Sequence, residues 1–220
     1  QLGRRPTTVK TRVMARHQHV TRIDREDVSD ISEEEGSLLA GTAADLMPAA
    51  SGIALEDYNK GVLIPSLIRS VLEGGSEVGK PTVVDPKRIR FFDFAGASVF
   101  KPNARELEDA MGERLRADDP AWMEEVRLRL RCTTLLLTLG EAGMAVMTKG
   151  HDLMRVPTVA RDGYDVSGAG GTAVTMAAGA TPHEAAVLAN HAAAVEVGKA
   201  GVATVSPQEI LRQQEIFTQT

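Results

Sequence analysis

Short apolar runs separated by helical patterns dominate the chain from residue 45 onward. Four stretches are almost entirely apolar and predict buried strands: SGIALE, PTVV, ASVF and TTLLLTLG. Between them apolar residues recur every three or four positions, as in PSLIRSVLEGGSE from Pro65 and in residues 120–131, which predicts amphipathic helices. This alternation predicts an α/β fold in which helices cover both faces of a mostly parallel sheet.

Other segments depart from this alternation. Residues 9–24 alternate apolar and polar side chains in places, which predicts a β hairpin. GMAVMTKG and HDLMRVPTV predict a pair of additional strands, a two-stranded excursion from the strand–helix alternation, after the last apolar run. Helices are predicted over about 171–178 and 182–198, and Ser32 with Glu35 forms a capping-box pattern that predicts the start of another helix.

Composition and charge exclude several classes of protein. The 220 residues are 43% hydrophobic and 25% charged, as in a soluble globular protein. A net charge of −5 without a basic stripe argues against a nucleic-acid partner. Cys132 is the only cysteine, which excludes an internal disulfide and favours a reducing compartment. No apolar run reaches the roughly 18 residues of a membrane span, so we expect a cytoplasmic protein without a membrane partner.

Polar motifs follow nearly every predicted strand. In open α/β sheets, ligands bind beyond the carboxyl ends of the strands, so these motifs are the candidate chemistry. They are DYNKG (57–61), DPK (85–87), KPNARE (101–106), TLGEAG (138–143) and DVSGAG (165–170). Each also has a purely structural interpretation. Asn103 and Glu106 fit helix capping, TLGEAG fits a β-turn, and charged loop residues are usually only solvated.

The glycine-rich stretch YDVSGAGGTAV is typical of a backbone that approaches phosphate. Glycines leave the N–H groups accessible, and a following helix adds partial positive charge. The pattern is neither the G-x-x-x-x-G-K-[ST] of P-loop proteins nor the G-x-G-x-x-G of dinucleotide folds. The stretch contains only one carboxylate, Asp165, which precedes the glycines.

The order of the motifs is more specific than any single one. KTR, DYNKG, DPK, KPNxxE, TLGxxG, DVSGAG and NHAAAVEVGKAG, in this order, resemble the carbohydrate kinases of the ribokinase (PfkB) family. Within it the chain is most similar to kinases that phosphorylate D-glycero-D-manno-heptose 7-phosphate at the anomeric hydroxyl. The segments of this chain that carry the similarity are VKTRVMARHQHVTRID, EDYNKGVL, VDPK, KPNARELE and ANHAAAVEVGKAGVATVSPQEI. Such kinases serve the ADP-heptose route to lipopolysaccharide and are often fused to a nucleotidyltransferase.

The resemblance runs over nearly the whole chain and implies a ribokinase-like fold that uses ATP and Mg²⁺. Residues 1–220 would form one kinase domain, with 9–24 as a small β lid and 45–220 as the nucleotide-binding core. Lid strands of this family often pair between subunits, so the resemblance also implies a homodimer. The near alternative is a kinase for another sugar.

The resemblance also assigns roles to individual residues. The anion hole for the transferring phosphate would be formed by Gly168, Ala169 and Gly170. The residues implied to contact ATP are Asn103, Ala104, Arg105, Glu106, Thr138, Gly140, Gly143, Asn190, Ala194 and Val197. For the last three, plain helix packing remains an alternative. Glu106 would hold Mg²⁺ through water. The residues implied to contact the sugar phosphate are Arg12, Arg16, Lys60, Asp85 and Lys87, with the two arginines on its 7-phosphate.

The chain departs from the family pattern in two places. It starts at the lid segment, so the family's first strands and a glycine–asparagine sugar-binding motif have no counterpart. In addition, Gly171 follows GAG where the family has the aspartate that accepts the proton of the attacking hydroxyl. The helix after it is also short, so we hypothesise that a segment beginning with this aspartate is missing here. An unbroken GAGGTAV in the expressed protein would contradict this. A genuine Gly171 would favour a catalytically silent binding protein.

Overall fold

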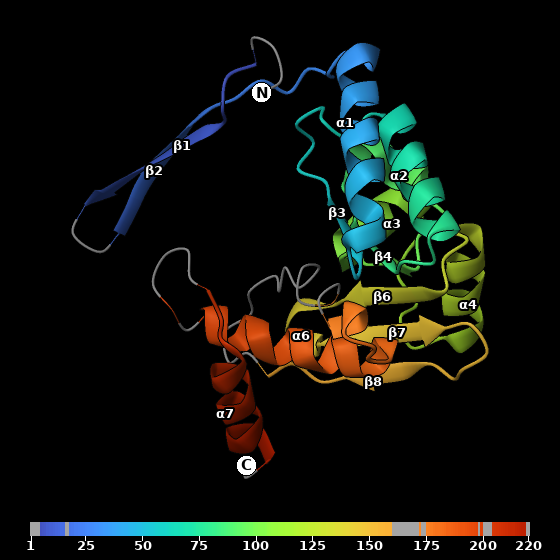
Figure 1. Cartoon of the computed structure of the whole chain (residues 1–220). Coiled ribbons are helices and arrows are strands. Elements are labelled where there is room, and N and C mark those ends of the chain that lie inside the picture. Colours follow the sequence, from blue (N-terminus) through green and yellow to red (C-terminus); the bar gives the residue numbers. More distant parts are fainter. Residues whose placement is uncertain are drawn as a thin grey trace.

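A six-stranded sheet forms the centre of the protein. The computed structural model describes residues 5–15, 18–159, 172, 175–197, 199 and 204–218. The strands lie in the order of the chain: β3 (Ile53–Glu56), β4 (Thr82–Asp85), β5 (Val99–Phe100), β6 (Thr134–Thr138), β7 (Met144–Thr148) and β8 (Met154–Val156). β3 to β6 are parallel, whereas β7 and β8 are antiparallel to their neighbours (Figure 1). The carboxyl ends of four parallel strands therefore meet at one edge.

Helices cover both faces of this sheet. The first group packs on one face and comprises α1 (Glu33–Leu46), α2 (Pro65–Glu77), α3 (Ala104–Met111) and α4 (Pro120–Arg129), with the 3₁₀ helices η1 (Met47–Ala49) and η2 (Arg88–Phe94). On the other face α6 (Pro182–Val197) lies against β7 and β8, and α7 (Pro207–Thr218) packs on α6. A further 3₁₀ turn, η3 (Gly140–Ala142), joins β6 to β7.

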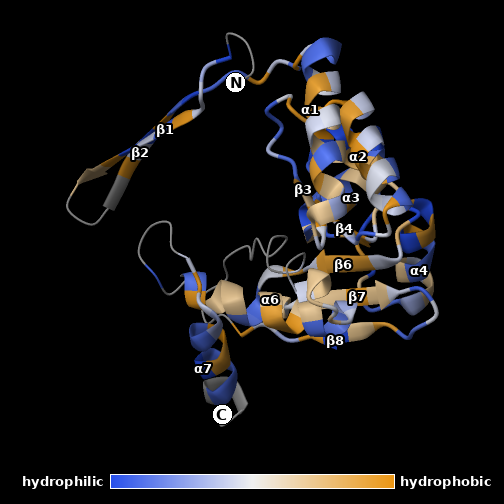
Figure 2. Cartoon of the chain, viewed as in Figure 1, coloured by the Kyte–Doolittle hydropathy of each residue, from blue (hydrophilic) through white to orange (hydrophobic). Residues whose placement is uncertain are grey.

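Alternation along the strands divides the core into two layers. Val84, Phe100 and Leu135 point toward the layer under α1 to α4. Their chain neighbours Val83, Val99 and Leu136 point the other way, toward a smaller layer that includes Ala186 of α6. All six side chains are at most 1% exposed, and Figure 2 shows β6 and β7 as largely hydrophobic. Burial on both faces explains why these strands read as continuous apolar runs.

Local sequence signals account for the helix boundaries. At α1 the Ser32 hydroxyl accepts a hydrogen bond from the Glu35 N–H at 3.2 Å, and the Glu35 carboxylate accepts one from the Ser32 N–H at 3.0 Å. This is the predicted capping box. α2 begins at Pro65, whose missing N–H costs nothing at the first helical position. Gly79 then takes a positive φ of 65° directly after this helix.

A β hairpin stands apart from the α/β body (Figure 1). It consists of β1 (Val9–Ala15) and β2 (Gln18–Arg25), which pair antiparallel with Thr11 opposite Ile23. Every residue of β1 is exposed, and Ile23 remains 60% exposed. The hairpin predicted for residues 9–24 is confirmed.

The predicted α/β architecture is confirmed, including the antiparallel excursion that β7 and β8 form. The elements that were not predicted include η2, which follows β4 where only a charged loop was expected, and α7. SGIALE was predicted as a buried strand, which is wrong for one of its faces: β3 is the edge strand of the described sheet, and its Ala54 and Glu56 are exposed. In the part of the chain that the structure describes, no helix has both the length and the apolar character needed to cross a membrane.

Candidate functional site

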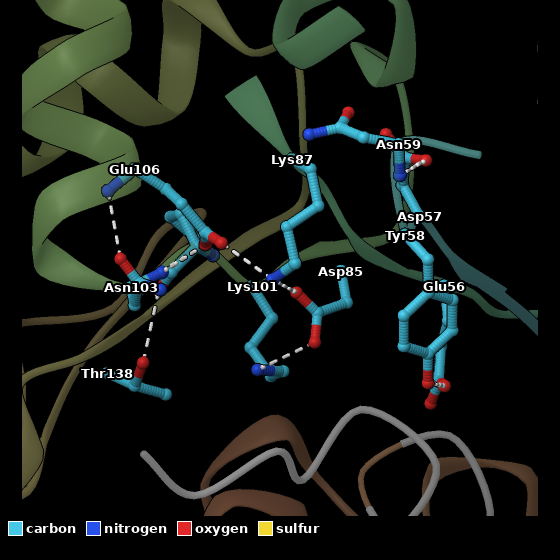
Figure 3. A network of polar contacts seen from close by, with 11 residues as sticks. Glu56, Asp57, Tyr58, Asn59, Asp85, Lys87, Lys101, Asn103, Glu106 and Thr138 are labelled. Carbon is cyan, nitrogen blue, oxygen red and sulfur yellow. Dashed lines mark hydrogen bonds and ion pairs between the residues drawn. The ribbon is translucent and has the colours of Figure 1, made fainter. Parts of the chain in front are cut away.

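A cluster of two carboxylates and two ammonium groups lies at the carboxyl ends of the parallel strands (Figure 3). Asp85 is the last residue of β4, and Lys87 follows two residues later. The Lys87 Nζ lies 3.3 Å from Asp85 Oδ1 and 2.6 Å from Glu106 Oε1, which comes from the first turn of α3. Lys87 therefore links the ends of two neighbouring strands.

Lys101 is the fourth charged residue of the cluster and its buried member. Its Nζ lies 3.2 Å from Asp85 Oδ2, and its side chain is only 4% exposed. A buried ammonium is costly unless a charge opposes it, so Asp85 balances Lys101 as well as Lys87. Lys101 was not among the residues predicted from the sequence; it directly follows the buried β5 strand and precedes Pro102.

The environment of Lys87 favours its charged form. Partial burial alone lowers the pKa of an ammonium group. The hydrogen bond to Glu106 and the attraction of the Asp85 and Glu106 carboxylates oppose this, and they raise the pKa of Lys87 above its ordinary value. Lys87 is therefore a cation at neutral pH, placed for contact with an anionic group.

Asn103 and Glu106 cap helix α3. The Asn103 Oδ1 accepts a hydrogen bond from the Glu106 N–H at 2.8 Å, and Glu106 Oε2 accepts one from the Asn103 N–H at 2.9 Å. The capping interpretation is confirmed. Glu106 also has a contact outside the cap, because its second carboxylate oxygen accepts a hydrogen bond from Lys87. Ala104 and exposed Arg105 occupy the first turn of the same helix.

Thr138 lies beside Asn103 at the end of β6. The two residues form an isolated parallel bridge, and the Thr138 N–H donates to the Pro102 carbonyl at 3.0 Å. The Thr138 hydroxyl donates to the same carbonyl at 3.4 Å and is buried. β6 thus brings Thr138 next to the α3 N-terminus.

A cavity of about 450 Å³ lies between the start of the hairpin and the loop after β3. Its lining residues are Thr8, Lys10, Glu56, Asp57, Tyr58, Lys60, Val62 and Leu63. The Asp57 N–H donates to the Asp85 carbonyl at 3.0 Å, which joins this loop to the ion cluster. A hydrogen bond to Glu56 at 3.0 Å raises the pKa of Tyr58, whose ring is largely exposed.

The residues assigned to the sugar phosphate are only partly brought together. Asp85 and Lys87 share the ion cluster, and Lys60 lines the cavity while pairing with Glu26. Arg12 lies on exposed β1, two residues beyond the cavity residue Lys10. Arg16 is outside the described residues. The same holds for the anion-hole candidates Gly168, Ala169 and Gly170 and for Gly171.

The two glycines of TLGEAG differ in their surroundings. Gly143 has φ 79° and ψ −129°, and a Cβ there would lie 2.1 Å from the Val156 carbonyl oxygen and 2.8 Å from the Thr158 nitrogen. Glycine is required at this position by close approach to the backbone at the end of β8. Gly140 has φ 58°, and a Cβ there would have no atom within 4 Å, so its outer side is open.

This contrast predicts a matched pair of substitutions. Gly143→Ala combines a backbone conformation that costs about 1–3 kcal/mol with a steric overlap that adds to it. Gly140→Ala carries only the left-handed penalty of about 1–2 kcal/mol. Chemical denaturation should therefore give a clearly lower free energy of unfolding for Gly143→Ala than for Gly140→Ala. Equal losses would contradict the contact seen at Gly143.

Of the three residues assigned to the adenine pocket, Asn190 has well-defined contacts. Its Nδ2 donates to the Pro157 carbonyl at 2.7 Å, and its Oδ1 accepts a hydrogen bond from the Val159 N–H at 3.5 Å. Asn190 is 2% exposed, so it ties α6 to the segment after β8. Ala194 is half-buried one turn later, and Val197 ends the helix.

His191, next to Asn190, predicts a pH dependence of stability. The residue is 3% exposed, and burial lowers its pKa from the ordinary 6.5. Below pH 6.5 the unfolded chain therefore binds a proton at His191 that the folded chain does not. The contribution of neutral His191 to the free energy of unfolding is fully present above this pH and is lost as the pH decreases. Melting temperatures should decline as the pH falls from about 6.5 to 5.5, and less steeply in His191→Gln. Exposed His151→Gln is the control, and an unchanged slope in His191→Gln would refute the assignment.

The described residues offer limited support for a metal ion. Among them, no group of three or more histidine, cysteine, aspartate or glutamate side chains could hold a metal. Mg²⁺ usually keeps several waters and binds one or two carboxylates together with substrate phosphates, rather than an all-protein cage. Glu106, with one oxygen toward Lys87 at the strand ends, fits such a water-mediated role.

Comparisons with solved structures place this fold among the ribokinase-like α/β proteins. Ribokinase from Giardia lamblia superposes with a TM-score of 0.71 at 17% identity, over 99% of this chain and 74% of that one. Arabidopsis thaliana ribokinase complexed with ribose and ATP gives 0.67 at 17% identity, over 88% and 65%. At these identities the likeness defines the fold alone.

Sequence comparison defines the family. The pattern of the pfkB family carbohydrate kinases matches residues 4–209. The chain is 39% identical over 224 residues to Bifunctional protein HldE of Citrifermentans bemidjiense, over 96% of this chain and 45% of that protein. It is 40% identical over 222 residues to its namesake in Pelobacter propionicus, over 94% and 44%. The chain therefore belongs to the pfkB family of carbohydrate kinases, which are sugar phosphotransferases. It spans less than half the length of these relatives.

Proposed function

We propose that the protein transfers the γ-phosphoryl group of ATP to the anomeric hydroxyl of D-glycero-D-manno-heptose 7-phosphate, with Mg²⁺. The reaction would serve ADP-heptose formation in the cytoplasm, and residues 1–220 would form its kinase domain. The observation that carries the proposal is the convergence of Asp85, Lys87, Lys101 and Glu106 at the ends of parallel strands in a pfkB-family chain. The choice of heptose rests on the similarity to proteins named HldE.

In this reaction the sugar oxygen forms a bond to the γ-phosphorus, the bond from that phosphorus to the β–γ bridging oxygen breaks, and ADP leaves with the electron pair. The hydroxyl proton passes to a base, for which the family pattern uses the aspartate expected where Gly171 stands. Lys87 would stabilise negative charge on the reacting groups, and Lys101 would support it through their shared partner Asp85. When bound, Mg²⁺ supplies further positive charge to the phosphates, and Glu106 would hold its water ligands.

The acceptor site of the proposal is the cavity between the hairpin and the loop after β3. Lys10 and Lys60 supply positive charge at its wall, and Asp57 and Glu56 supply hydrogen-bond acceptors for sugar hydroxyls. Arg12, on the same face of β1 as Lys10, would contact the phosphate at the far end of the substrate.

Gly171 supports one alternative from another class. If glycine truly replaces the expected aspartate, the protein would bind nucleotide and sugar phosphate without turnover. A general base typically contributes about 10²- to 10⁴-fold in rate, so its loss would be plain in kcat.

ADP release by the full-length protein, measured with Mg²⁺–ATP and a panel of sugar phosphates, tests the proposal. Turnover with heptose 7-phosphate above all other acceptors supports it. Turnover only with another sugar would support kinase activity but refute heptose 7-phosphate as the acceptor. ATP binding by calorimetry without any turnover would favour the silent alternative.

The hairpin predicts self-association. Its exposed apolar side chains, including Val13 and Ile23, would be covered if hairpins of two copies paired, so we propose a homodimer. Light scattering should give twice the protomer mass, and Ile23→Lys should shift it toward the monomer. A monomer at all concentrations would contradict this.

A further inference from the structure

The guanidinium of Arg5 connects three backbone segments at the root of the hairpin. Its Nη1 donates to the Ser29 carbonyl at 2.7 Å, and its Nη2 donates to the Asp27 carbonyl at 2.7 Å and also to the Lys60 carbonyl. Arg5 precedes β1, Asp27 and Ser29 follow β2, and Lys60 belongs to the loop after β3. One side chain thus holds both ends of the hairpin against the loop that lines the cavity.

Further contacts make this junction a defined one. The Ile31 N–H donates to the Gly61 carbonyl at 2.8 Å, and Lys60 forms an ion pair with Glu26. Gly61 has φ 69°, and a Cβ there would lie 1.9 Å from the Ser29 carbonyl oxygen. The two backbones therefore approach too closely for any other residue, and the loop and the hairpin root are fixed to each other.

The position of the hairpin sets the shape of the cavity. Thr8 and Lys10 contribute the hairpin side of its wall, and Tyr58 and Lys60 contribute the opposite side. The hairpin has few other contacts with the body, since every residue of β1 is exposed. A change at its root would therefore displace Lys10 relative to Lys60.

We infer that Arg5 is a positioning residue for the acceptor substrate, which it serves by holding the hairpin at a set angle to the loop 57–61. This inference rests on the proposed function. Arginine suits the role because its donors spread over a rigid fork that reaches separate acceptors, whereas the ammonium of lysine is a single point. The Asp85–Lys87–Glu106 cluster lies beyond this junction and makes no contact with Arg5 among the described interactions.

Steady-state kinetics of the full-length protein test the inference. Arg5→Ala should raise the KM for the sugar phosphate about tenfold, because hydrogen bonds from a charged group are lost, and leave the KM for ATP unchanged. Arg5→Lys should give an intermediate value. Arg114→Ala, at an exposed position on the loop after α3, is the control and should match the wild type. Equal effects on both KM values, or no effect, would overturn the inference.

Hydrogen exchange provides a readout that does not depend on turnover. Arg5→Ala should speed exchange of the Ile31 amide, which is bonded to the Gly61 carbonyl, without changing exchange in β6. Unchanged exchange at Ile31 would also overturn the inference. A wild-type protein without kinase activity would refute the proposed function instead, and the exchange measurement would still decide the role of Arg5.

Discussion

Asp85→Asn is expected to lower the melting temperature by about 6–20 °C. Asp85 opposes both Lys87 and Lys101, and the Lys101 side chain is only 4% exposed. Removing one partner of a buried ion pair typically costs about 3–5 kcal/mol, because the other charge stays buried without compensation. For a domain of this size, 1 kcal/mol corresponds to about 2–4 °C. Thermal unfolding followed by circular dichroism measures the change.

A double substitution separates the lost charge balance from lost packing. In Asp85→Asn/Lys101→Met the buried ammonium is gone, so part of the stability should return. Asp109→Asn, on the exposed side of α3, serves as the control and should melt like the wild type. If the double variant were no more stable than Asp85→Asn alone, Lys101 would not be the source of the loss.

Glu106→Gln is expected to reduce kcat by about a hundredfold or more while the fold persists. Glutamine at this position can still accept the hydrogen bond from the Asn103 N–H, so the capping box remains. The charge opposite Lys87 is lost, as is the carboxylate proposed to hold the water ligands of Mg²⁺. Removing one electrostatic group at a transferring centre typically costs about 10²–10³ in kcat. Steady-state ADP release at saturating substrates is the measurement.

Glu108→Gln provides the matched control on the same helix. Glu108 is exposed and accepts a hydrogen bond from the Leu115 N–H at 3.0 Å, which glutamine can also accept. Its kcat and melting temperature should equal those of the wild type. A Glu106→Gln protein with wild-type kcat would mean that this residue only caps the helix.

Much of the fold followed from the sequence because its central strands are buried on both faces. The runs that became β4, β5 and β6 could be recognised since almost every side chain in them is apolar. η2 was missed because RIRFFDF carries no regular period, and tertiary packing of Phe91 and Phe94 decides its conformation. α7 begins with Ser206 and Glu209 as a capping pair, a signal that was present in the sequence and was overlooked.

The site could be predicted to the level of its loops but not of its contacts. Motif order placed Asp85, Lys87, Asn103 and Glu106 at strand ends, and the structure brings them together. Lys101 was overlooked, because a lysine between a buried strand and a proline looks solvated until its partner is known. Asn190 was assigned to the adenine pocket from the resemblance. In the structure its side-chain amide donates a hydrogen bond to the backbone after β8, a contact that the sequence did not indicate.

The most direct test of the account is the identity of the product. The full-length protein, Mg²⁺–ATP and D-glycero-D-manno-heptose 7-phosphate should give one ADP for each sugar bisphosphate, and ³¹P NMR should show the new phosphate on the anomeric carbon. No bisphosphate, or a new phosphate on another carbon, would contradict the account.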